Sequence, residues 1–169
     1  MSTIPAAHKA EGPRVVRCAV VTVSDTRTLE NDQGGLLIVQ MLEEAGHRVA
    51  ARRIVRDEPQ AIQAQVGELT ARDDLDVLLM TGGTGIGSRD QTCETVSGLL
   101  DKPLPGYGEL FRMLSFREIG AAAMLSRAMA GVVARKVVMT MPGSPAAVRL
   151  AMENLILPEL AHLVREARR

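Results

Sequence analysis

The 169-residue sequence has few aromatic residues and no excess of charge of either sign. Its aromatic side chains are Tyr107, Phe111 and Phe116, so it lacks the stacking platform on which single-stranded nucleic acid binds. Twenty basic residues balance 20 acidic residues, which leaves no overall field to attract nucleic acid or an anionic membrane. We therefore expect a small molecule or a protein as the partner, and neither nucleic acid nor a membrane.

Cysteine is also scarce, and no hydrophobic run is long enough to cross a membrane. Cys18 and Cys93 are too few for a disulfide framework and lack CxxC spacing. The first 13 residues have no apolar centre of the secretory type, and no stretch approaches the roughly 20 apolar residues of a membrane helix. We expect a soluble cytoplasmic protein, with a flexible arm over residues 1–13 and a single domain over residues 14–169.

Apolar runs with strand and helix periodicity alternate along the chain. Four runs rich in aliphatic or β-branched residues are predicted to be strands: residues 15–24, 48–56, 76–81 and 136–141. Helices are predicted to follow them over residues 31–47, 59–69, 92–100 and from 144 onward. The signals are acidic Asp32 near the start of the first helix, a C-cap position at Gly46 and an N-cap at Ser144. This alternation predicts a three-layer α/β fold with a mainly parallel central sheet.

Proline and glycine mark the remaining segments. In residues 102–109, KPLPGYGE, they predict a loop, and two helical patterns are expected over residues 110–130. Pro158 is expected to kink or restart the last helix. The small apolar residues of EIGAAAMLSRAMAGVV, residues 118–133, fit either an ordinary core helix or an interface between subunits.

Three loops that leave predicted strands carry unusual residues: SDTRT, TGGTGIGSRD and MPGSP. Ligands bind at the carboxyl ends of the strands in sheets of this kind, so the three loops are expected to form one site. The middle loop, residues 81–90, is rich in glycine, which lets the backbone N–H groups approach an anion closely. Phosphate is therefore the ligand expected to bind at this loop.

Other interpretations of the glycine loop remain. It lacks the lysine of a Walker A motif, and Ser88 replaces the third glycine of a dinucleotide fingerprint, which disfavours a nucleotide-binding oxidoreductase or methyltransferase. The loop could also be a tight turn without a ligand. In that case Asp25 is a turn residue, and Asp57 and Asp90 are helix-cap or first-turn residues.

Acidic residues beside an anion site point to a metal-assisted reaction. Carboxylates repel phosphate unless a divalent cation lies between them, and Mg²⁺ is commonly held by one or two carboxylates together with phosphate oxygens and water. The sequence therefore favours phosphoryl or nucleotidyl transfer.

Six motifs in order over residues 17–158 resemble the MoaB/MogA family of molybdenum cofactor biosynthesis proteins, and are most similar to its MoaB branch. The motifs are VSDTRT, EEAGH, TGGTGIGSRDQT, PGYGELFRMLSFREIG, SRAMAG and MPGSP. The resemblance implies a domain that forms homotrimers or homohexamers and binds molybdopterin, a pterin dithiolene with a terminal phosphate. It also implies an Mg²⁺-dependent transfer of AMP from ATP to that phosphate, with release of pyrophosphate.

The resemblance also implies the site residues. Asp57 in VRDEPQ and Asp90 in GSRDQT match the catalytic acidic pair, with Asp90 expected to hold Mg²⁺ and Asp57 to help place the metal or the pterin phosphate. The other residues expected to bind substrate or nucleotide are Ser24, Asp25, Thr81, Gly82, Gly83, Thr84, Gly85, Ser88, Arg89, Gly106, Gly108, Glu109, Arg112, Ser115, Arg127, Pro142, Gly143 and Ser144. The alternative is a noncatalytic molybdopterin carrier or scaffold, which would not require both acids. Other enzymes of the pathway are candidate partners.

Overall fold

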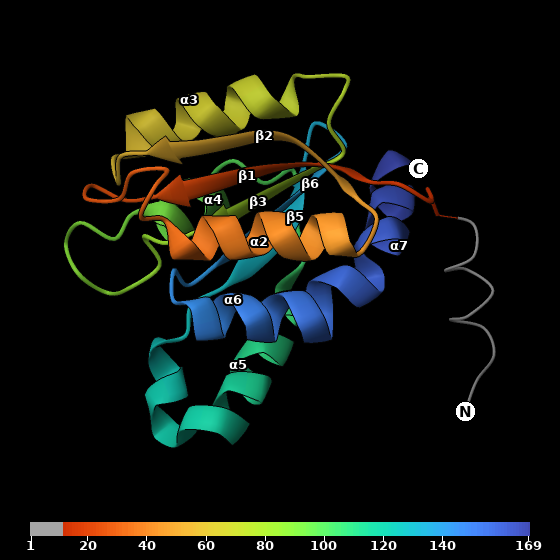
Figure 1. Ribbon diagram of the computed structural model, residues 1–169. Helices are drawn as coiled ribbons and strands as arrows, with labels where there is room; N and C mark the ends of the chain where they lie inside the picture. The colour runs from red at the N-terminus through yellow and green to blue at the C-terminus, as the bar shows by residue number, and fades with distance from the viewer. Residues whose placement is uncertain (1–11) are drawn as a thin grey trace.

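The computed structural model describes residues 12–169 and arranges them in three layers (Figure 1). Most of the predicted arm, residues 1–13, therefore lies outside the described residues. The central layer is a six-stranded sheet with the order β2-β1-β3-β6-β5-β4. The first four strands of this order pair in parallel, while β5 and β4 pair antiparallel at one edge. This architecture confirms the predicted three-layer α/β fold.

The strands are β1 (Arg17–Val23), β2 (Arg48–Val55), β3 (Val77–Thr81), β4 (Lys102–Pro103), β5 (Met129–Val133) and β6 (Lys136–Met141). The helices are α2 (Gln33–Glu44), α3 (Pro59–Thr70), α4 (Thr92–Ser97), α5 (Pro105–Ile119), α6 (Pro145–Ala151) and α7 (Leu157–Arg168). A 3₁₀ helix (Gly120–Leu125) follows α5, and a π-helical turn (Met152–Ile156) joins α6 to α7. The change of helical geometry just before Pro158 matches the restart predicted there.

Aliphatic side chains fill both faces of the sheet, because successive residues of a strand point to opposite sides. Val20 and Leu79 pack on the face covered by α2, α6 and α7, whereas Val21 and Met80 pack on the face covered by α3 (Figure 1). Strands buried on both faces explain why their sequences are almost continuously apolar. Because β1, β3 and β6 are parallel neighbours, their carboxyl ends lie at the same edge of the sheet. The loops that follow these strands meet at that edge.

The caps expected at Gly46 and Ser144 are confirmed, and the acidic residue expected near the start of α2 is itself the N-cap. Asp32 caps α2, with its Oδ1 accepting the N–H of Gly35 at 2.9 Å. Ser144 caps α6, with its Oγ accepting the N–H of Ala147 at 3.2 Å, and Gly46 follows α2 at a φ of +81°. These contacts satisfy N–H groups that have no partner inside a helix.

Three sequence interpretations between α4 and β6 are wrong. Residues 102–109 do not form a loop, because they contain β4 and the first turn of α5, whose Pro105 occupies an early position where no N–H is needed. Residues 110–130 are not wholly helical, because Ala130 lies in β5 and pairs with Met139 of β6. The core-helix interpretation of residues 118–133 is also wrong, since they form the end of α5, the 3₁₀ helix and β5.

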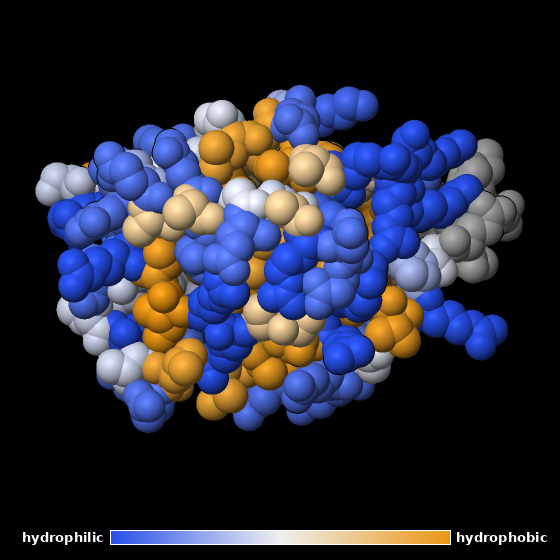
Figure 2. Space-filling model, turned by 90° about the horizontal axis from the view of Figure 1, so that it is seen from above, coloured by the Kyte–Doolittle hydropathy of each residue, from blue (hydrophilic) through white to orange (hydrophobic). Residues whose placement is uncertain are grey.

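The described surface is mixed. Figure 2 looks down from the side of α3 and shows mainly hydrophilic residues, with smaller apolar areas between them. Exposed large apolar side chains are concentrated on α5 and the 3₁₀ helix, where they are Leu110, Met113, Phe116, Ile119, Met124 and Leu125. Over residues 12–169, none of the helices combines the length and hydrophobicity needed to cross a bilayer.

Candidate functional site

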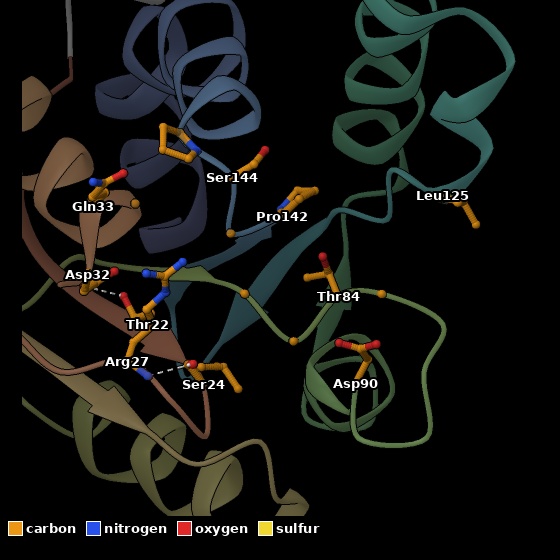
Figure 3. Close-up of a pocket in the computed structure, with 17 residues that line it drawn as sticks. Thr22, Ser24, Arg27, Asp32, Gln33, Thr84, Asp90, Leu125, Pro142 and Ser144 are labelled. Atoms are coloured by element: carbon orange, nitrogen blue, oxygen red, sulfur yellow. Dashed lines mark hydrogen bonds between the residues drawn. The ribbon is translucent and has the colours of Figure 1, made fainter.

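A cavity of about 590 Å³ opens at the carboxyl ends of β1, β3 and β6 (Figure 3). All three predicted loops contribute to it, as expected for a parallel sheet with ligand-binding loops at one edge. Of the predicted residues, those that line it are Ser24, Gly82, Gly83, Thr84, Gly85, Asp90, Pro142, Gly143 and Ser144. The three loops that the sequence singled out therefore line one cavity.

Glycines form the floor of the cavity, since the loops approach one another too closely for side chains. A Cβ atom on Gly82 would lie 2.4 Å from the carbonyl oxygen of Val23, and Gly82 has a φ of +91°. A Cβ atom on Gly34 would lie 2.9 Å from the carbonyl oxygen of Gly143. These close approaches explain the glycines at the end of β3 and in the first turn of α2.

Asp90 lies on the cavity wall beside the glycine loop (Figure 3). Its Oδ2 accepts the N–H of Gly87 at 2.8 Å and would lie 2.6 Å from a Cβ atom on Gly85. The helix-cap interpretation of Asp90 is wrong, because Gln91 is the N-cap residue of α4 and the Asp90 side chain bonds within its own loop. Asp90 thus shapes the loop and places a carboxylate on the cavity.

Asp57 is buried behind the glycine loop and does not line the cavity. Its Oδ1 accepts the N–H of Gln91 at 2.9 Å, and its Oδ2 would lie 2.4 Å from a Cβ atom on Gly83. Burial raises the pKa of Asp57, and the negative charges of Asp90 and Asp25 raise it further, while the hydrogen bond from Gln91 opposes the shift. The side chain makes no cap for α3, so that interpretation is wrong too.

Arg89 ties the glycine loop to the loop after β1. It donates from Nη2 to Oδ2 of Asp25 at 2.8 Å and from Nε to the same atom at 3.1 Å. The hydrogen bonds from Arg89 lower the pKa of Asp25. Asp25 also accepts the N–H of Asp57 at 3.2 Å. The ion pair between Asp25 and Arg89, both predicted site residues, therefore links three loops. Nearby, the carbonyl oxygen of Ser88 accepts a hydrogen bond from the side chain of Gln91.

Arg127 holds the other side of the glycine loop. Its Nε donates to the carbonyl oxygen of Thr84 at 2.8 Å, and its two terminal nitrogens contact the two carboxylate oxygens of Glu94 at 2.5 and 3.0 Å. Hydrogen bonding to Arg127 lowers the pKa of Glu94. Arg127, predicted to bind substrate, is therefore engaged with protein groups on α4 and the loop.

The other predicted residues are not part of the lining of the main cavity. Ser115 is buried and lines a second cavity of about 230 Å³, which shares Leu125, Pro142 and Ser144 with the first. Thr81 is buried and donates to the carbonyl oxygen of Pro142. The structure does not bring the α5 residues Gly106, Gly108, Glu109 and Arg112 into either of these cavities. Gly108 instead packs against the backbone of Ala128.

Sequence reasoning missed four polar side chains that line the main cavity: Thr22, Arg27, Asp32 and Gln33. Arg27 is part of the SDTRT loop, so its position directly after a buried strand was a usable signal. Asp32, which the sequence places only near the start of a helix, also accepts hydrogen bonds from Thr22 at 2.8 Å and from Arg52 at 3.0 Å. Across residues 12–169, no group of three or more His, Cys, Asp or Glu residues has the arrangement of a metal site.

Comparison with known proteins identifies the family. A family model described as a probable molybdopterin binding domain matches residues 19–162. The molybdenum cofactor biosynthesis protein B of Bacillus cereus is 55% identical over 163 residues, which cover 96% of each chain. A crystal structure of a molybdenum cofactor biosynthesis protein B has a TM-score of 0.91 and 54% identity, covering 94% of this chain and 99% of that one.

A more distant structure has the same fold. The tungsten cofactor synthesizing protein MoaB of Pyrococcus furiosus has a TM-score of 0.83 and 34% identity, covering 93% of this chain and 99% of that one. The family match, the relative from Bacillus cereus and both structures agree with the family resemblance of the sequence. The chain therefore belongs to the MoaB family of molybdenum cofactor biosynthesis proteins.

Proposed function

We propose that this protein transfers AMP from ATP to the terminal phosphate of molybdopterin and releases pyrophosphate. The observation that carries the proposal is the cavity at the carboxyl ends of β1, β3 and β6, which is lined by the glycine loop and by Asp90. Such a surface suits a phosphate whose charge is neutralised by a divalent cation. Relatives named as molybdenum cofactor biosynthesis proteins support the choice of pterin.

The shape of the site supports a reaction between two substrates. The main cavity, of about 590 Å³, and the smaller one, of about 230 Å³, meet at Leu125, Pro142 and Ser144. A nucleotide and a pterin held in adjoining cavities could bring their phosphates together beside the glycine loop. Alignment of this kind replaces a bimolecular encounter, which lowers the barrier without proton abstraction by the protein.

Asp90 fits a role in metal binding better than Asp57 does. Its carboxylate lies on the cavity wall, whereas the carboxylate of Asp57 is buried behind the loop. Mg²⁺, when bound there, would neutralise negative charge between Asp90 and the substrate phosphates. The loop N–H groups would hold the phosphate oxygens in place, and the nucleophile is already an anion at neutral pH.

We assign Asp57 a positioning role in this reaction. Through its hydrogen bond to the N–H of Gln91 and its contact with Gly83, it fixes both ends of the segment that carries Asp90. A carboxylate that is kept buried despite neighbouring negative charges is typical of functional sites. The pair thus acts as one unit, with one carboxylate at the cavity and the other behind it.

The alternative is a noncatalytic carrier of molybdopterin. The same cavities would hold the pterin in that case, but ATP would not be consumed. Pyrophosphate release from Mg²⁺-ATP, measured with and without molybdopterin, distinguishes the two functions. Release that requires molybdopterin supports adenylyl transfer, while stable pterin binding without release supports the carrier.

We further propose that the protein forms a homotrimer or homohexamer through α5 and the 3₁₀ helix. Met124 is 80% exposed, Phe116 is 62% exposed and Leu125 is 57% exposed. Exposed apolar surface of this extent is typical of a protein–protein interface. Sedimentation at micromolar concentration tests the assembly. A monomeric mass would contradict it.

A further inference from the structure

Four arginines surround the main cavity and its loops, and they differ in their partners. Three of them are bound to a carboxylate, at 3.0 Å for Arg52 and Asp32, 2.8 Å for Arg89 and Asp25, and 2.5 Å for Arg127 and Glu94. The fourth is Arg27, whose side chain makes no ion pair with any residue of 12–169. Its Nη1 donates to the carbonyl oxygen of Asn31 at 3.2 Å.

Arg27 also differs from the other three in its position. It lines the cavity, and within the described chain no other lysine or arginine does so. Figure 3 shows its guanidinium pointing into the cavity, between Asp32 and the loops that carry Thr84 and Ser144. The cavity therefore has one cationic side chain whose charge is not compensated by a protein carboxylate.

The backbone around Arg27 is held in place although its side chain is exposed. Ser24 Oγ accepts the N–H groups of Thr26 and Arg27, each at 3.2 Å. Asn31 Oδ1 accepts the N–H of Thr28 at 2.9 Å. Two side chains thus fix the turn that presents Arg27, which reduces the entropy that a ligand must overcome to order this loop.

We propose that Arg27 binds a phosphate group of the ligand in this cavity and sets the preference of the site for phosphorylated over unphosphorylated ligands. A guanidinium matches two phosphate oxygens with a pair of parallel hydrogen bonds. It would offset the repulsion between the phosphate and Asp90 on the wall of the same cavity. The choice of ligand rests on the proposed function, in which the nucleotide and the pterin both carry phosphate.

Binding measurements on four proteins test the proposal: wild type, Arg27→Gln, Arg27→Lys and Arg53→Gln. Arg53 is the matched control because it bonds Glu68 and lies outside the cavity lining. One pair of probes is Mg²⁺-ATP and adenosine, and the other is molybdopterin and an unphosphorylated pterin. Circular dichroism verifies that each variant is folded.

Arg27→Gln is expected to weaken binding of a phosphorylated probe about 10- to 100-fold and to leave its unphosphorylated counterpart unchanged. Arg27→Lys should bind the phosphorylated probe with intermediate affinity, because lysine keeps the positive charge but cannot form two parallel hydrogen bonds. Arg53→Gln should match the wild type. The probe pair that responds identifies the phosphate that Arg27 contacts. The proposal is overturned if Arg27→Gln binds every probe as the wild type does, if phosphorylated and unphosphorylated probes weaken equally, or if the wild type binds neither phosphorylated probe.

Turnover separates this inference from the proposed function. Loss of phosphate affinity in Arg27→Gln, combined with no adenylyl transfer by the wild type, would support Arg27 and contradict the reaction. Adenylyl transfer by the wild type with unchanged affinities in Arg27→Gln would support the reaction and contradict the role of Arg27.

Discussion

Asp57 accepts the backbone N–H of Gln91 through Oδ1 at 2.9 Å, so a buried carboxylate fixes the residue that follows Asp90. The two acids of the family motif are thus adjacent in the structure without sharing the cavity surface. This relationship separates a contribution to loop position from a contribution to metal and phosphate binding. Variants of each acid should therefore behave differently.

Asp57→Asn is expected to keep the loop in place while impairing the reaction. Asparagine retains an oxygen that can accept the N–H of Gln91, and it removes a charge whose burial is unfavourable. We expect a free energy of unfolding at pH 7 equal to or above that of the wild type, with adenylyl transfer lowered at least about tenfold. Denaturant titration and turnover assays measure the two effects, and wild-type turnover in this variant would contradict the role of Asp57.

The pH dependence of stability gives a separate test of Asp57. Because its pKa is raised above 3.8, the folded state binds more protons than the unfolded state between 3.8 and the folded pKa. The wild type should therefore lose stability relative to Asp57→Asn as pH rises through that window, and the full difference should persist above it. If the free energy of unfolding depends on pH in the same way in both proteins, the pKa of Asp57 is not raised and this account is contradicted.

Asp90→Asn should impair the reaction without impairing pterin binding. The variant keeps a side-chain oxygen for the N–H of Gly87 but removes the charge that faces the cavity. We expect transfer to fall by two or more orders of magnitude, since electrostatic stabilisation at a transferring phosphate is among the larger contributions to catalysis. Molybdopterin affinity should stay within about threefold of the wild type, and turnover equal to the wild type would contradict the assignment.

Gly83→Ala tests the contact between the glycine loop and Asp57. Gly83 has a φ of +61°, and a Cβ atom there would lie 2.3 Å from Thr92 Oγ1 and 2.4 Å from Asp57 Oδ2. We expect the free energy of unfolding to fall by more than about 1 kcal/mol. Gly67→Ala is the control, because Gly67 lies inside α3 with no atom within 4 Å of the added methyl group, and it should stabilise the protein by about 0.5–1 kcal/mol. Similar effects of both substitutions would contradict the close packing at Gly83.

The contact between Arg127 and Glu94 should weaken in acid. Because hydrogen bonding to Arg127 lowers the pKa of Glu94 below 4.5, the stabilisation from this pair is present above 4.5 and lost as pH falls through the lower, folded value. A double-mutant cycle with Arg127→Gln and Glu94→Gln, run at pH 7 and at pH 3, measures the coupling. Equal coupling at both pH values would contradict an ionised pair.

Most of the fold follows from local patterns, but one hairpin does not. The parallel strands β1, β3 and β6 are continuous apolar runs, and their helices carry recognisable caps at Asp32 and Ser144. The hairpin of β5 and β6 turns through Ala134 and Arg135 at φ values of +47° and +63°, positions that usually hold Asn or Gly. Without that signal, residues 129–133 could not be recognised as a strand from the sequence.

The helix α5 was hidden for a different reason. Its first turn contains Gly106 and Gly108, which favour a loop when considered alone. A Cβ atom on Gly108 would lie 2.4 Å from the carbonyl oxygen of Ala128, so tertiary packing requires the glycine there. A contact between residues 20 positions apart leaves no local signature.

The site was predictable in its loops and less so in the function of each residue. The glycine cluster after β3 indicated the loop that lines the cavity, whereas only the fold separates Asp90 on the wall from Asp57 behind the loop. Arg89 and Arg127 matched family motifs, yet both bond to protein carboxylates, while Arg27 points into the cavity (Figure 3). Which arginine is available to a ligand depends on long-range pairing that spacing in the sequence does not encode.

The most direct test of the central claim is chemical identification of the product after incubating the purified protein with molybdopterin, ATP and Mg²⁺. The proposed function predicts adenylylated molybdopterin and pyrophosphate in equal amounts from the wild type, and at least about 100-fold less of both from Asp90→Ala. Unmodified molybdopterin and intact ATP, recovered with a wild type that binds the pterin, would contradict adenylyl transfer.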